Sequence, residues 1–179
     1  LWTDMSEIVR PTRDGIHGRE FISTVVEIGE KPAYLRFDEQ GELAGPAPTT
    51  ITTQMPFLFD MPVNPGRSDP LAPILAEAAR QVETLAMLPI ASVIELSPPG
   101  RHSERIEHIV PVITPETWHL LDSLSWQPGM LVLDGWDRER FETLRQRFPG
   151  TIVCVRVPMD TNILELVQQG VRAFHLTAN

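Results

Sequence analysis

Two polar side chains in the last third of the chain are of types that can move protons. Asp134 follows the apolar residues 130–133 and precedes Gly135, and His175 lies in the segment 174–177. A carboxylate can act as a general base, and a histidine exchanges a proton near neutral pH. We therefore expect Asp134 and His175 to be catalytic candidates. An Asp-Gly turn would explain Asp134 equally well, and a hydrogen-bonded core residue would explain His175.

A single cation, Arg156, interrupts the apolar segment 151–157 near its C-terminal end. Side chains alternate along a strand, so Arg156 shares a face with Cys154. If that face points into a barrel, Arg156 closes the core at the mouth. A cation in a buried strand needs an anionic partner. Two explanations stand side by side: an ion pair with Asp134 or Asp160, or contact with a ligand.

The most polar part of the chain is residues 10–20, which contain Arg10 and Arg13, and also His17 between two glycines. Guanidinium groups bind phosphate or carboxylate through paired hydrogen bonds, so these residues are candidates for holding an anionic substrate. The alternative is a surface turn in which the arginines and Asp14 pair with each other. Exposed charge clusters of that kind usually do no chemistry.

The elements that must position these side chains alternate between two patterns. Short apolar segments predict strands, and the polar segments between them have helical spacing. Strands that alternate with helices pair in parallel through right-handed crossovers. The expected strands are residues 57–59, 85–88, 92–96, 109–113, 130–133, 151–157 and 173–176, and the expected helices are residues 71–82, 114–126, 137–148 and 161–169.

The chain divides into two parts that differ in their predicted secondary structure. Residues 1–54 are a β-rich lead-in with strands expected at 21–28 and 34–37 and a turn at 38–42. Residues 55–179 carry fewer parallel-type strands than the eight of a complete (β/α)₈ barrel, and their number depends on how residues 85–96 divide. We therefore expect an α/β fold in which a small β-rich segment precedes the N-terminal portion of a TIM-type barrel. The opening Leu-Trp-Thr-Asp suggests that the sequence starts inside a longer gene product.

Composition excludes several classes of partner. The net charge is -9, with 24 acidic against 15 basic side chains, which disfavours nucleic acid and anionic membranes. One cysteine rules out a disulfide framework within the chain and fits a reducing cytoplasm. No apolar segment is long enough to cross a bilayer. The motifs GxGxxG, GxxxxGK[ST], GxSxG and HExxH are absent.

The order of these pieces resembles a known family. A proline-flanked strand at residues 55–60 is followed by the helix Leu-Ala-Pro-Ile-Leu-Ala-Glu-Ala-Ala-Arg, and later by Thr-Ile-Val-Cys-Val-Arg-Val and by Val-Arg-Ala-Phe-His-Leu-Thr-Ala-Asn. This resembles the FMN-binding barrel of glutamate-synthase-like proteins, whose relatives include the type 2 isopentenyl-diphosphate isomerases and α-hydroxy-acid oxidases. The resemblance implies an FMN-dependent oxidoreductase with the flavin at the C-terminal mouth of the barrel.

The resemblance also implies positions for the flavin contacts. Arg156 falls where the family has a flavin-contacting Lys, Phe59 and Asp60 fall under the flavin ring, and Thr177 and Asn179 fall at the exit of the next strand. Two differences point to a diverged member: Arg stands in place of Lys, and residues 60–63 lack the family's Met-Ser-Phe-Gly type motif.

Three functions remain open from the sequence. The first is part of an FMN-dependent oxidoreductase acting on a small, anionic molecule. The second is a barrel module that has lost its cofactor and acts as a scaffold or interaction domain in a larger enzyme complex. The third is a flavin-free, phosphate-binding barrel enzyme. A partial barrel has an unpaired strand edge, so we expect it to contact the remainder of a longer polypeptide, partner subunits or a second copy.

Overall fold

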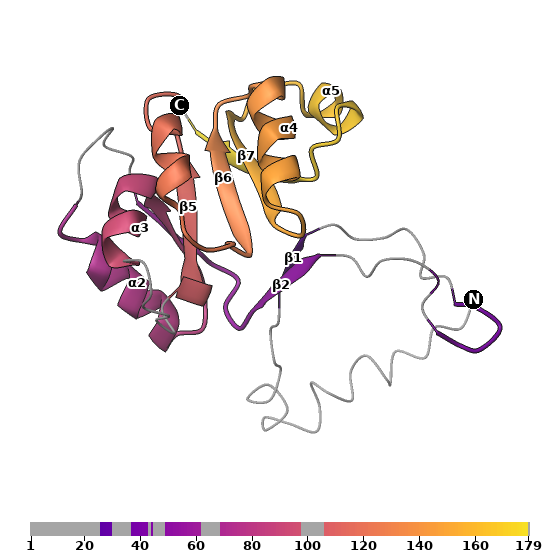
Figure 1. Cartoon of the computed structure of the whole chain (residues 1–179), viewed down its shortest axis with the longest axis horizontal. Coiled ribbons are helices and arrows are strands. Elements are labelled where there is room, and N and C mark those ends of the chain that lie inside the picture. The colour runs from indigo at the N-terminus through magenta and orange to yellow at the C-terminus, as the bar shows by residue number, and fades with distance from the viewer. Residues whose placement is uncertain are drawn as a thin grey trace, which may run out of the picture.

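A computed structural model describes residues 26–29, 37–42, 44, 49–61, 69–97 and 106–178. The fold is mixed α/β: a six-stranded parallel sheet curls into a half-barrel, and a two-stranded antiparallel sheet precedes it (Figure 1). The expected fold class, a partial TIM-type barrel after a small β-rich segment, is therefore confirmed.

The strands of the half-barrel pair in the order in which they occur along the chain, and all are parallel. Helical segments connect successive strands, as parallel pairing requires. The strands are β3 (Phe59–Asp60), β4 (Ala86–Pro89), β5 (Ile109–Ile113), β6 (Met130–Asp134), β7 (Ile152–Pro158) and β8 (Ala173–Thr177). The helices are α2 (Ala72–Gln81), α3 (Ile90–Leu96), α4 (Arg138–Arg147) and α5 (Ile163–Gln168), with 3₁₀ helices η2 (Ile106–His108) and η3 (Trp118–Ser123).

The sheet separates two apolar cores because successive side chains of a strand point to opposite faces. The outer core lies between the sheet and its helices, and includes Leu131 and Val155 together with Phe141 of α4. The inner core fills the concave face, and its buried members are Leu85, Met87, Val110, Val112, Met130, Val132, Ile152 and Cys154. Cys154 and Ile152 therefore face inward, and Arg156, two residues further on, shares their face.

A hairpin of β1 (Val26–Gly29) and β2 (Thr50–Thr53) packs against the N-terminal end of the half-barrel. Ile28 and Ile51 join the inner core there. A Cβ placed on Gly129, just before β6, would lie 3.1 Å from Ile51 Cδ1, so the approach is close. Figure 1 shows the hairpin at the end of the sheet opposite the C-terminus of the chain. The C-terminal ends of the strands form the other end of the half-barrel, which we call the mouth.

Two expected elements differ in type. Residues 92–96 belong to helix α3 and not to a strand, because β4 ends at Pro89 and the buried residues Ile90 and Val93 then recur at helical spacing. The helix expected over 114–126 is the 3₁₀ helix η3. This helix begins at Trp118 and not at Thr114, because Thr114 N donates to Thr117 Oγ1 at 2.9 Å and the two residues form a turn.

Most other expected elements are confirmed. Helix α4 is capped by Asp137, whose Oδ1 accepts from Arg140 N at 3.0 Å. The turn at residues 38–42 is held by Asp38 Oδ1, which accepts from Gln40 N and Glu42 N. Strand β2 was not expected. The expected strand at 34–37 lies outside the described residues, apart from Phe37.

Candidate functional site

Four charged or titratable side chains meet at the mouth, and we call them the mouth cluster: Asp60, Asp134, Arg156 and His175. Each comes from a different strand, respectively β3, β6, β7 and β8. In the sheet register Asp134 is paired with Arg156, and Arg156 with His175. Neighbours in register point to the same face, which brings these side chains together on the concave side.

Arg156 is the centre of the mouth cluster. Its Nη2 donates to Asp60 Oδ1 at 2.6 Å, and its Nη1 lies 3.6 Å from Asp134 Oδ2. Its Nε donates to His175 Nδ1 at 3.1 Å. The side chain is 10% exposed, whereas those of Asp60 and Asp134 are 40% and 33% exposed. The ion pair expected with Asp134 is present, and the second forms with Asp60, not Asp160.

The mouth cluster joins the two edges of the half-barrel. Four interstrand spacings separate β3 from β7, about 19 Å along a flat sheet. The 2.6 Å ion pair between Asp60 and Arg156 therefore requires a strongly curled sheet. His175 Nε2 also lies 3.6 Å from Asp60 Oδ2, which links the edge strands β3 and β8. We call the gap between these two strands the seam.

His175 is held in one protonation state by its surroundings. Because Arg156 Nε can only donate, His175 Nδ1 must accept, so the proton of the neutral ring is on Nε2. Burial lowers the pKa of His175, and the charge of Arg156 lowers it further, while Asp60 and Asp134 act in the opposite direction. The ring is therefore neutral at pH 7, and its Nε2–H faces Asp60.

The charge of the mouth cluster bears on the flavin expected there. With His175 neutral, one guanidinium and two carboxylates sum to a net charge of about -1. Arg156 already has two anionic partners, so it is no free cation for an anionic flavin. The residues of the mouth cluster therefore present no unpaired positive charge to a ligand. They offer a hydrogen-bonding surface instead.

An apolar pocket of about 350 Å³ lies along the seam below the mouth cluster. His175 borders it, and its other walls include Leu58, Met87, Met130, Cys154 and Ala173. Burial raises the pKa of the Cys154 thiol to about 12, although the charge of Arg156 opposes this. Cys154 is therefore a protonated, apolar wall residue and not a nucleophile.

The other expected site residues lie apart from the mouth cluster. Phe59 packs against the outer core, with its ring centroid 5.8 Å from that of Phe57, so its side chain points away from the mouth. Thr177 Oγ1 donates to Val157 O at 3.4 Å at the end of β8. Arg10, Arg13, His17 and Asn179 lie outside the described residues.

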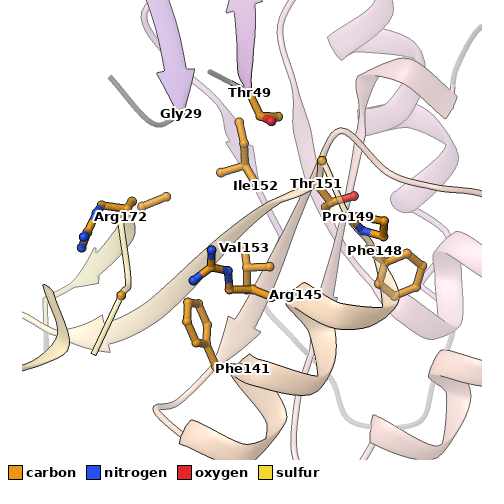
Figure 2. Close-up of a pocket in the computed structure, with 13 residues that line it drawn as sticks. Gly29, Thr49, Phe141, Arg145, Phe148, Pro149, Thr151, Ile152, Val153 and Arg172 are labelled. Atoms are coloured by element: carbon orange, nitrogen blue, oxygen red, sulfur yellow. The ribbon is translucent and has the colours of Figure 1, made fainter. Parts of the chain in front are cut away.

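A second pocket, of about 310 Å³, lies at the opposite end of the half-barrel. We call it the lower pocket. It is bordered by the end of α4, the start of β7 and β8, and the hairpin, and Figure 2 shows Arg145 and Arg172 among its walls. Sequence patterns do not predict this pocket, because both arginines are exposed and resemble ordinary solvated charges.

No protein-family model matches the chain, and the searches of curated proteins and of solved structures also give no match. Among the described residues, no group of three or more His, Cys, Asp or Glu side chains could hold a metal ion. In the same part of the chain, no helix is long and apolar enough to span a membrane. The chemistry of the mouth cluster is therefore the basis for a functional proposal.

Proposed function

We propose that this half-barrel is part of a barrel enzyme that acts on a small molecule at the mouth, and that the enzyme is an FMN-dependent oxidoreductase of the glutamate-synthase-like type. The observation that carries the proposal is the mouth cluster, assembled from four strands. Enzymes built on parallel barrels place reacting groups at the C-terminal ends of their strands. The family resemblance in the sequence supports FMN as the cofactor.

The proposed roles follow from the geometry. Arg156 holds Asp60 and Asp134 in place, which positions the two carboxylate groups at the mouth. His175 is neutral and carries its proton on Nε2, so its Nε2–H can donate a hydrogen bond that orients a substrate at the mouth. FMN, where bound, supplies hydride transfer, which no side chain can supply.

The experiment is a titration of the intact protein with FMN, followed by the fluorescence of the flavin. We expect saturable binding. Arg156→Met should weaken it by about tenfold or more, because two like charges would then face the flavin unpaired. Arg147→Met is the matched control: it removes an arginine that is also ion-paired, with Asp122, but on helix α4 and away from the mouth.

Two results decide the proposal. A purified protein that is colourless and does not quench added FMN contradicts the oxidoreductase function. Equal weakening by Arg156→Met and Arg147→Met would mean that Arg156 has no special place near the flavin.

A second candidate is a barrel module that has lost its cofactor and acts as a scaffold in a larger complex. The saturated charge of Arg156 favours it, because a buried arginine with two carboxylate partners can serve to close the core. Native mass spectrometry after gentle purification tests it: co-purifying subunits with no flavin support the scaffold, and a flavin-loaded protein contradicts it.

A further inference from the structure

The two arginines of the lower pocket differ from the other arginines that the structure describes. Five of these seven pair with a carboxylate, namely Arg80, Arg138, Arg140, Arg147 and Arg156. The remaining two, Arg145 and Arg172, have no carboxylate partner among the described residues, and both line the lower pocket. In a chain with a net charge of -9, this places two unbalanced positive charges in one cavity.

Both guanidinium groups are nevertheless held in place. Arg145 lies over the ring of Phe141, with its Cζ 5.8 Å from the ring centroid. Arg172 Nη1 donates to Val167 O at 2.8 Å and to Val171 O at 3.1 Å. An aromatic ring and main-chain carbonyl groups orient a cation without neutralising it. The arginines are therefore positioned, and most of their N–H donors remain available.

The shape and lining of the lower pocket leave space for a ligand beside Arg145. Gly170 has φ of +94°, and a Cβ at that position would lie 3.3 Å from Arg145 Nη1, so glycine leaves room beside the guanidinium group. None of the residues that line the pocket is acidic. Phe148, Pro149 and Ile152 supply apolar wall. Figure 2 shows Arg145 beside Phe141, with Arg172 across the pocket and with Gly29 of the hairpin and Thr49, just before β2, bordering it.

We propose that the lower pocket binds a small organic anion, with its phosphate or carboxylate group held by Arg145 and Arg172 and its apolar part against the Phe148 wall. Guanidinium groups pair with the oxygens of both anions in the same way. A volume of about 310 Å³ is at the lower end of the range for small-molecule sites. None of the mouth-cluster residues lines the lower pocket, so the proposal is tested independently of FMN binding.

Calorimetric titration of the intact protein tests the site, with phenyl phosphate, benzoate and inorganic phosphate as probes at constant ionic strength. We expect phenyl phosphate or benzoate to bind, and to bind more tightly than inorganic phosphate because of the apolar wall. The comparison of phenyl phosphate with benzoate identifies which anionic group the site prefers. Absence of binding by both organic anions overturns the proposal, and tighter binding of inorganic phosphate overturns the role of the wall.

Substitutions of the two arginines test whether the anion binds in the lower pocket. The double substitution Arg145→Gln with Arg172→Gln should lower the affinity for the preferred probe by about tenfold or more, because two charged donors are lost. Arg138→Gln is the matched control: it changes an exposed arginine of the same helix, which pairs with Glu142. Equal weakening by the control would mean non-specific attraction and overturn the proposal. Arg145→Lys with Arg172→Lys, which keeps both charges, should bind more tightly than the glutamine pair, and guards against a folding defect.

Discussion

His175 is the residue through which pH acts on the mouth cluster. Its pKa in the folded protein is lowered by burial and by Arg156, whereas the unfolded chain has the ordinary value of about 6.5. The unfolded state therefore binds more protons below pH 6.5. The stability that His175 contributes is fully present above that pH and is lost as the pH falls toward the lower, folded value.

We predict that His175→Gln makes stability less sensitive to acid. Between pH 7.5 and pH 5.5 the original protein should lose more free energy of unfolding than the variant, because glutamine does not titrate. Urea unfolding at both pH values, followed by circular dichroism, measures the difference. Equal losses would show that His175 is not buried beside Arg156.

The thiol of Cys154 should be inert in the folded protein. Because burial raises its pKa from 9.0 to about 12, the thiolate fraction at pH 8 falls by about 1000-fold. We expect iodoacetamide to leave Cys154 unmodified in native protein and to alkylate it rapidly in urea, as mass spectrometry would detect. Rapid alkylation without urea would place Cys154 outside the inner core.

The members of the mouth cluster were visible in the sequence, but most of their contacts were not. Arg156 in an apolar strand indicates the need for an anion, and the sequence pattern predicts Asp134 as one partner. The pair with Asp60 could not be found by spacing, because 96 residues separate it from Arg156 and only the curl of the sheet brings the two together. Sequence spacing does not predict the lower pocket, because its arginines are exposed and far apart in the chain.

At the scale of elements, apolar segments predicted most strands well, because the strands of a parallel sheet are buried on both faces. The prediction of a strand at residues 92–96 was wrong for a related reason. Helix α3 is short and apolar, and periodicity alone does not separate such a helix from a buried strand. The prediction that a helix begins at Thr114 was wrong because the side chains of Thr114 and Thr117 hydrogen-bond to each other and form a turn. A capping signal in the sequence does not distinguish such a turn from the start of a helix.

Gly29 fixes the hairpin against the half-barrel. Its φ is +148°, and a Cβ there would collide with Thr49 O and approach Ile152 Cδ1 to 3.1 Å. We predict that Gly29→Ala lowers the free energy of unfolding by more than about 1 kcal/mol, because both strain and overlap oppose it. Thermal unfolding measures this. Gly41→Ala is a control with a positive φ but open space, and a similar loss in both would show that overlap is unimportant.

The whole molecule has two ends with different charge. The mouth carries Arg156 paired with two carboxylates, and the lower pocket carries two arginines without a carboxylate partner among the described residues. The hairpin covers the N-terminal end of the inner core, and the mouth cluster bridges the seam at the other end. The curl of the sheet is thus the feature on which both the cluster and the proposed enzyme depend.

A double-mutant cycle between Asp60 and Arg156 tests that feature most directly. The free energies of unfolding of the original protein, Asp60→Asn, Arg156→Met and the double variant would be measured by urea unfolding. Residues in direct contact give a coupling of about 0.5 to 3 kcal/mol, so we predict a value in that range. Additive losses, with no coupling between the two positions, would contradict the ion pair, the closed seam and the half-barrel mouth.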